Sequence, residues 1–142
     1  MGQLIWRYHP ELRRYEIFGE GGGNTFGIEI DSKGRIFSGH NGGDTRGFHY
    51  VQGGYSQKGF SKHGPLSNPF TFGYFPAMKH ANVPRFTHAF SIYEGAALPE
   101  AYRGRLFGVA PLQSHVVMSD VEPDGSTFQT KDVGLAIESE DD

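Results

Sequence analysis

The 142-residue sequence contains no cysteine. Disulfide bonds, cysteine-ligated zinc, thiol catalysis and covalent attachment of haem are therefore all excluded within these residues. Excess charge of one sign is also lacking, because 13 basic and 16 acidic side chains leave a formal net charge of −3. A charge so close to neutral creates no strong field for a polyanion, which argues against nucleic acid as the ligand.

Long hydrophobic runs are absent as well. No apolar stretch approaches the roughly 20 residues that a membrane-spanning helix requires. The first residues, Met1 to Arg7, lack the charged-then-apolar order of a secretory signal peptide. Taken at face value, this N-terminus favours a cytoplasmic location.

Glycine and aromatic residues are abundant instead. Glycine occupies 21 positions, which is about twice its average use, and proline adds 8 more. This density of turn-forming residues limits the length of any helix and requires many turns. The 12 Phe, 7 Tyr and 1 Trp can supply a hydrophobic core. Together these features favour short strands joined by glycine-rich loops.

The clearest local pattern is a β-hairpin within residues 26–39. Phe26, Ile28 and Ile30 alternate with small or acidic residues, the period of a strand with one buried face. Residues 32–34 predict a tight turn, after which the chain returns as the partner strand. Further short strands are expected at residues 4–8, 15–18, 105–109, 115–121 and 127–130, with turns at 21–24 and 123–126.

Two of these regions echo each other. The run Gly34-Arg35-Ile36-Phe37 recurs as Gly104-Arg105-Leu106-Phe107, which suggests repeated four-stranded units. Between them, residues 40–88 are rich in Gly, aromatic residues and His, and we expect a long ordered insertion there. A propeller blade takes about 40–50 residues. The sequence therefore predicts an all-β fold, a partial β-propeller of about two to three four-stranded blades, as one domain over 1–142.

One loop offers candidate metal ligands. Asn41 and Asp44 follow a predicted strand and lie among glycines whose backbone carbonyls could complete a calcium site. An Asn-Gly turn followed by an Asp-capped loop explains the same residues without a metal. The spacing does not match an EF-hand, so both readings stay open.

The aromatic and histidine residues also allow two interpretations. Phe70, Phe72, Tyr74 and Phe75 could stack on sugar rings, although packing beneath the insertion is the simpler explanation. The seven histidines include no pair with the spacing of a helical zinc motif. They could serve as bases or ligands, or they could satisfy the backbone groups of loops.

Five runs of the sequence resemble a known family. They are residues 23–37, 49–55, 58–69 and 73–76, and a later interrupted run of 93–95, 98–99 and 102–107. These runs resemble the propeller domain of large planctomycete-type membrane-bound dehydrogenase-like proteins, which are of the haem-binding, glucose/sorbosone dehydrogenase-like kind and similar to quinoprotein propellers. The resemblance covers nearly the whole chain.

This resemblance implies a sugar or polyol dehydrogenase-like oxidoreductase in the periplasm, with pyrroloquinoline quinone and calcium as cofactors. It implies a histidine on the propeller face that takes the proton of the substrate hydroxyl, and an arginine that binds the cofactor. His63, His88 and Arg85 are the nearest candidates by residue type and position. The c-type haem segment that such proteins usually carry has no counterpart here.

The expected blade number also bears on function. A closed ring needs at least about four blades, so we expect this chain to be a fragment of a longer protein or to assemble from several copies. An open arc leaves two terminal faces bare, and isolated chains should then oligomerise or aggregate. The alternative function is a non-catalytic propeller that binds carbohydrate or protein partners.

Overall fold

The structure is a computed structural model that describes residues 3–40, 44–57, 74–80 and 89–139. Within these ranges the chain forms strands and two short 3₁₀ turns but no α-helix, so that no described helix is long and apolar enough to cross a membrane. The elements are β1 (Leu4–His9), β2 (Arg14–Gly21), β3 (Glu29–Ile30), β4 (Ile36–Gly39), β5 (Gly47–Tyr50), β6 (Gly54–Ser56), β7 (Lys79–His80), β8 (Phe90–Ile92), η1 (Glu100–Tyr102), β9 (Leu106–Ala110), η2 (Pro111–Gln113), β10 (His115–Asp124) and β11 (Thr127–Glu138).

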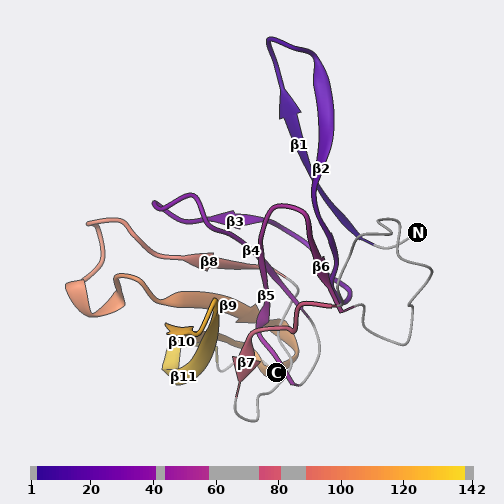
Figure 1. The fold of residues 1–142 in the computed structure, drawn as a ribbon. Coiled ribbons are helices and arrows are strands. Elements are labelled where there is room, and N and C mark those ends of the chain that lie inside the picture. The colour runs from indigo at the N-terminus through magenta and orange to yellow at the C-terminus, as the bar shows by residue number, and fades with distance from the viewer. Residues whose placement is uncertain (1–2, 41–43, 58–73, 81–88, 140–142) are drawn as a thin grey trace.

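The strands form three open sheets (Figure 1). Sheet A has the order β1-β2-β6, sheet B the order β3-β4-β5, and sheet C the order β7-β11-β10-β9-β8. Neighbouring strands are antiparallel except for the β2/β6 and β7/β11 pairs, which are parallel. The prediction of an all-β fold is confirmed. The expected insertion, 40–88, contributes one strand to each sheet in its described part.

Sheet B is the middle layer of the molecule, and one of its faces packs against sheet C. Phe37 of β4 is fully buried, and its ring meets that of Phe128 of β11 edge-on at 5.4 Å between centroids. This core cluster stabilises the packing of sheet B on sheet C through hydrophobic burial. Its buried members are Phe37, Met78, Phe90, Leu106, Ala110 and Phe128.

The opposite face of sheet B packs against sheet A. Phe48 and Tyr50 of β5 form a second core cluster with Ile5 of β1, and Phe18 packs against it. The Tyr50 hydroxyl donates to the carbonyl of Gly21, at 3.1 Å. Burial raises the pKa of Tyr50 to about 12. Because residues on a strand alternate between faces, sheet B is covered on both sides.

The echoed sequence runs occupy equivalent places in sheets B and C. Gly34 and Gly104 both adopt positive φ, at 73° and 77°, in the connection between the first and second strand of each meander. The arginine after each glycine pairs with a carboxylate, Arg35 with Asp31 and Arg105 with Asp120. Glycine reaches such φ values at the least steric cost, which explains why the echo begins with that residue.

Asp31 organises the first of these turns. Its carboxylate accepts hydrogen bonds from the backbone of Lys33, at 3.0 Å, and of Arg35, at 2.9 Å. Burial alone would raise the pKa of Asp31, but the hydrogen bonds and the nearby guanidinium charge outweigh it and hold the pKa below its usual value. Ser32 in the same turn binds Glu94 through both its backbone N–H and its hydroxyl, which ties sheet B to the loop after β8.

The prediction of a buried face for residues 26–31 is wrong. The hairpin and its turn are present, but Phe26, Ile28 and Ile30 are 61%, 52% and 60% exposed. Strand β3 is only two residues long and lies at the edge of sheet B, where side chains remain largely exposed.

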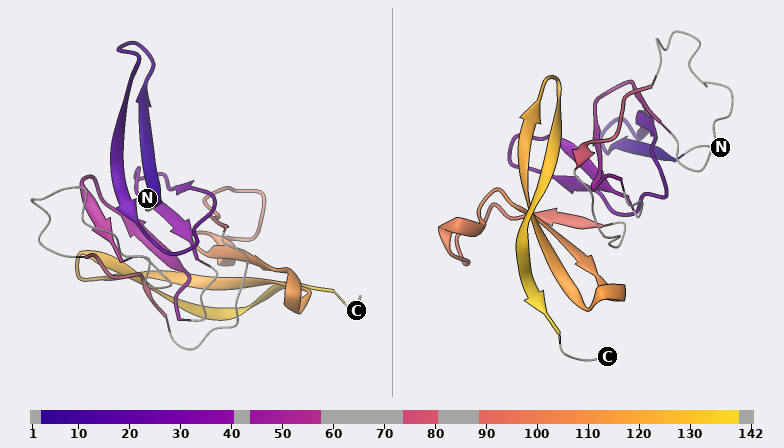
Figure 2. Two further views of the ribbon diagram at one scale, coloured as in Figure 1. Left: turned by 90° about the vertical axis from the view of Figure 1, so that its right-hand side faces the viewer. Right: turned by 90° about the horizontal axis from the view of Figure 1, so that it is seen from below.

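The two predicted hairpins at the chain ends are present and longer than expected. Strands β1 and β2 extend away from the body of the molecule as a two-stranded arm (Figures 1 and 2). Strand β11 continues to Glu138 rather than ending at Thr130, past register shifts in its pairing with β10.

Candidate functional site

The most polar part of the interior is an ion pair between sheets B and C. Arg46, which precedes β5, has a side chain only 1% exposed and binds both carboxylate oxygens of Asp132 on β11. The hydroxyl of Ser119 on β10 donates to the same carboxylate, at 2.5 Å. Such two-pronged arginine–carboxylate pairs are among the strongest polar contacts in proteins. This pair therefore joins two sheets through residues that lie 86 positions apart in the sequence.

A buried histidine completes the cluster. The side chain of His80 on β7 is fully buried, and its Nδ1 lies 2.6 Å from the hydroxyl of Thr130. Its Nε2 lies 3.7 Å from Asp132 and has no hydrogen-bond partner among the described residues. Burial lowers the pKa of His80; the Asp132 charge opposes this shift and the Arg46 charge adds to it. The neutral imidazole is therefore favoured in the folded protein.

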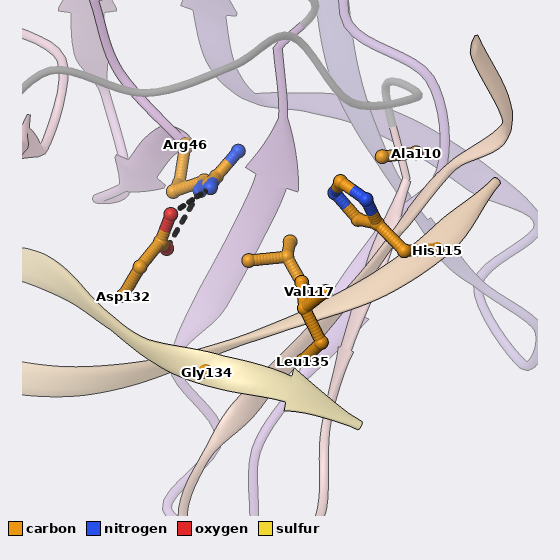
Figure 3. A pocket seen from close by; sticks show the side chains of 7 residues that line it. All are labelled: Arg46, Ala110, His115, Val117, Asp132, Gly134 and Leu135. Carbon is orange, nitrogen blue, oxygen red and sulfur yellow. Dashed lines mark hydrogen bonds and ion pairs between the residues drawn. The ribbon is translucent and has the colours of Figure 1, made fainter. Parts of the chain in front are cut away.

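The ion pair forms one wall of a pocket (Figure 3). The pocket has a volume of about 160 Å³, and His115 lies on the opposite side from Arg46. Ligand pockets for drug-sized molecules measure about 300–1,000 Å³, so this one is small. Apolar groups and glycine supply most of its lining, which consists of Arg46, Ala110, His115, Val117, Asp132, Gly134 and Leu135.

The cluster has the composition of a hydroxyl–imidazole–carboxylate relay but not the accessibility of one. Thr130 is 4% exposed and the His80 side chain not at all. A nucleophile must reach its substrate, and neither of these groups can. Asp132 is already bound by Arg46 and Ser119. The arrangement therefore joins the two sheets through buried polar contacts.

The catalytic residues suggested by the resemblance, His63, Arg85 and His88, lie outside the described residues, as does the metal candidate Asn41. Asp44 is described and exposed. No three His, Asp or Glu side chains of the described ranges gather as metal ligands. The proposed roles of all five residues stay predictions.

The aromatic run that could stack on sugar rings is described only in part. Phe70 and Phe72 lie outside the described ranges, whereas Tyr74 and Phe75 are 42% and 44% exposed. Both rings are therefore partly exposed, and the choice between sugar stacking and core packing stays a prediction. Tyr74 contacts Tyr55 edge-on, with 6.3 Å between ring centroids.

A second candidate site lies on the arm. Trp6 pairs with Ile17 and Tyr8 with Tyr15, which places all four side chains on one face of the β1–β2 hairpin. We call this the arm face. Trp6 is 55% exposed, Ile17 43%, Tyr8 49% and Tyr15 72%. An exposed apolar group of this kind is typical of an interaction surface.

Sequence reasoning missed both the buried ion pair and the arm face. No local pattern marks Arg46 or Asp132, because each lies in an ordinary polar context and the partners are distant in the chain. The arm face could have been found. Residues 4–8 and 15–18 were expected as paired strands, and an alternation of Trp6 and Tyr8 with charged residues was readable there.

The described elements define an all-β protein of stacked antiparallel meanders with a projecting hairpin. The chain belongs to the family described as a domain of unknown function (DUF7133), which matches residues 1–141. No curated protein and no solved structure matches it.

Proposed function

We propose that this chain is a binding module, an arc of a β-propeller that docks onto further β-structure and catalyses no reaction by itself. One observation supports this function above the others. Sheet B buries apolar residues on both faces, whereas sheet C exposes Val109 and Ile137 on its outer face and the arm of sheet A exposes Trp6 and Tyr15.

The order of the strands favours a propeller arc. Strands β8, β9, β10 and β11 form four consecutive antiparallel strands, the repeat unit of a propeller blade. Strands β3, β4 and β5 form a similar meander that stacks on the first. Successive blades of a propeller stack face to face, so the three stacked sheets are read as successive blades.

The uncovered faces favour binding over catalysis. On the outer face of sheet C, Val109, Val116 and Ile137 form a cross-strand row, which we call the outer row. Val109 is 51% and Ile137 63% exposed. Large exposed apolar patches are rare on monomeric proteins and usually mark interaction sites. The arm face provides a second such patch at the far end of the stack.

The experiment that tests this function measures mass and turnover on one sample. Light scattering of the purified chain over a hundredfold range of concentration should give a mass that rises above 15.7 kDa. Dye reduction with aldoses, pyrroloquinoline quinone and calcium should stay at the level of the heat-denatured chain. A monomer at every concentration, or turnover of a sugar, would contradict the proposal.

The second candidate is the propeller module of a sugar or polyol dehydrogenase-like oxidoreductase, incomplete on its own. It is supported by the sequence resemblance, which includes the runs 58–69 and 73–76. In this case the same assay on a longer protein that contains this chain would give turnover. Loss of that turnover in His63→Ala, with retention in the matched surface variant His9→Ala, would favour the oxidoreductase.

A further inference from the structure

We propose that His80 is a pH-sensitive switch that holds β7 on the edge of sheet C at neutral pH and releases it in acid. The switch joins three elements, because His80 lies on β7, its polar neighbours Thr130 and Asp132 lie on β11, and the arginine bound to that carboxylate precedes β5. This inference goes beyond the proposed function and does not depend on it, since it concerns how the fold is held closed.

The buried imidazole of His80 fits its site as a neutral ring with the hydrogen on Nε2. Its Nδ1 lies 2.6 Å from the hydroxyl of Thr130, and its Nε2 lies 3.7 Å from the carboxylate of Asp132. A carboxylate only accepts hydrogen bonds, whereas a hydroxyl can donate one. The ring hydrogen is therefore placed best on Nε2, toward Asp132, and Nδ1 accepts the hydroxyl hydrogen of Thr130.

A second proton on the ring disrupts this arrangement. It has to go on Nδ1, where the hydroxyl hydrogen of Thr130 already points, so the hydroxyl must turn and its hydrogen loses its acceptor. Thr130 is only 4% exposed, and a buried donor without an acceptor costs free energy. The closed site therefore disfavours the protonated ring through its hydrogen bonds.

The charges of the site disfavour the protonated ring as well. Arg46 and Asp132 form one ion pair, so the site is neutral as long as His80 is neutral. Protonation would place two cations against one carboxylate, with the arginine side chain 1% exposed and the histidine side chain not exposed at all. Such a buried charge is costly, and the cost disappears in water. In agreement, burial lowers the pKa of His80, the Asp132 charge opposes this shift, and the Arg46 charge adds to it.

The other described titratable groups around β7 supply no further negative charge to His80. Lys79, its neighbour on β7, has a side chain 74% exposed and pairs with Asp124 at 2.6 Å. Lys131 is exposed on β11. His115 lies on the far side of the pocket beside the buried ion pair (Figure 3). These groups are basic or already paired, so the charge balance of the site depends on His80 itself.

Strand β7 is the element that yields. It is two residues long and lies at the edge of sheet C, where it pairs with β11. The pair of Lys79 with Asp124 is largely exposed, and exposed ion pairs contribute little stability. Met78, just before β7, is fixed instead, because it is 1% exposed and its N–H donates to the carbonyl of Gly47 at 2.9 Å. Release should therefore include Lys79 and His80 and stop at Met78.

The direction of the pH dependence follows from proton uptake. In the released form His80 lies in water and binds a proton near its usual pKa of 6.5, whereas the closed form resists protonation. The ratio of released to closed molecules should rise as the pH falls below about 6.5, by at most about tenfold per pH unit. Release also frees the backbone of β11 at Gln129 and Thr130, which then forms an open sheet edge. Acid should thus change the strand edge that sheet C presents.

The test follows amide hydrogen exchange of the full chain by NMR at pH 7.5 and 5.5. The measured rate of each amide, divided by its intrinsic rate in an unfolded peptide, gives an opening constant. The opening constants of the amides that pair β7 with β11 should exceed those of β4 at both pH values, because release leaves the core folded. They should rise about tenfold from pH 7.5 to 5.5, as expected for the uptake of one proton by a group with a pKa of about 6.5.

Two variants assign this rise to His80. His80→Gln keeps a side chain that forms hydrogen bonds but does not titrate, so the opening constants of β7 should be the same at both pH values. His115→Gln is the matched control, because it removes a histidine from the pocket beside the same ion pair but outside the contact with β7. This control should keep the tenfold rise. A rise that persists in His80→Gln, or that is lost in His115→Gln, would overturn the switch.

The wild type decides the question if His80→Gln leaves β7 open at every pH. NMR signals of the His80 ring should report the neutral form with hydrogen on Nε2 at pH 7.5. The ring should become protonated only as the β7 amides lose their protection. A protonated ring beneath protected amides would contradict the proposal. So would opening constants of β7 that do not change with pH, or that equal those of β4 because the whole chain unfolds. None of these measurements depends on association or turnover, so the proposed function keeps its own separate test.

Discussion

Phe37 and Phe26 belong to the same hairpin region and differ completely in environment. Phe37 lies on the middle strand of sheet B and is fully buried between two sheets, whereas Phe26 precedes the edge strand and is 61% exposed. The two residues have the same transfer free energy from water. The difference therefore comes from position within sheet B: its middle strand is covered by the neighbouring sheets, whereas the residues before its edge strand are exposed.

The largest expected effect is on the buried ring. Phe37→Ala should lower the free energy of unfolding by about 3–5 kcal/mol, because it removes buried contacts and leaves a cavity. Phe26→Ala should change it by less than about 0.5 kcal/mol. Urea unfolding at one low protein concentration measures both. Equal losses in the two variants would contradict the difference between the middle strand and the edge of sheet B.

The buried ion pair gives the next effect. Asp132→Ala should cost about 3 kcal/mol, because Arg46 would remain buried without its carboxylate. Asp120→Ala removes the partner of Arg105 from a half-exposed pair and should cost less than about 1 kcal/mol. Thermal unfolding of the two variants compares them. A double change, Arg46→Met with Asp132→Leu, should recover most of the loss; failure to recover would mean that the pair does more than neutralise a buried charge.

Substitution of the two equivalent glycines, Gly34 and Gly104, should lower the free energy of unfolding by smaller and similar amounts. Gly34→Ala and Gly104→Ala should each cost about 1–2 kcal/mol, since both backbones are left-handed and a Cβ meets nothing within 4 Å. The cost is therefore one of conformation and not of space. Gly34→Asn should cost less, because Asn tolerates this conformation. Denaturant midpoints measure these changes, and unequal losses at the two glycines would weaken the equivalence of sheets B and C.

Acid should lower the free energy of unfolding gradually, through two histidines that lie in or beside sheet B. Burial lowers the pKa of His49 and of His80; for His49 the Arg35 charge adds to the shift and Asp31 opposes it. As the pH falls, these histidines bind protons in the unfolded chain near their usual pKa of 6.5, before they do so in the folded chain. Stability is therefore fully present above about pH 6.5 and is lost below it, by at most about 1.4 kcal/mol per pH unit for each histidine.

Urea unfolding at pH 8, 6.5 and 5.5 measures this slope. His49→Phe keeps a ring between Phe37 and Phe128 and removes one of the two protons, so it should flatten the slope. Stability that is constant or rises as the pH falls from 8 to 5.5 would show that neither histidine is held neutral.

The sequence predicted those parts of the fold that depend on local pattern. Alternation and turn residues located both terminal hairpins and the turn at 32–34, and the glycine echo marked equivalent positions in two sheets. Burial was predicted less well, because alternation at Phe26, Ile28 and Ile30 indicates a two-sided strand but not which side another sheet covers. The Arg46–Asp132 pair was not predictable, since it depends on how distant strands stack. The catalytic candidates His63, Arg85 and His88 stay predictions.

The central claim is that the outer faces of the stack are docking surfaces and the middle layer is complete. Amide hydrogen exchange at low and high protein concentration tests it most directly. Protection of β1, β2 and the end of β11 should increase with concentration, while protection of β4 and β5 stays unchanged. Equal exchange at both concentrations throughout these strands, or a change confined to β4 and β5, would contradict the claim.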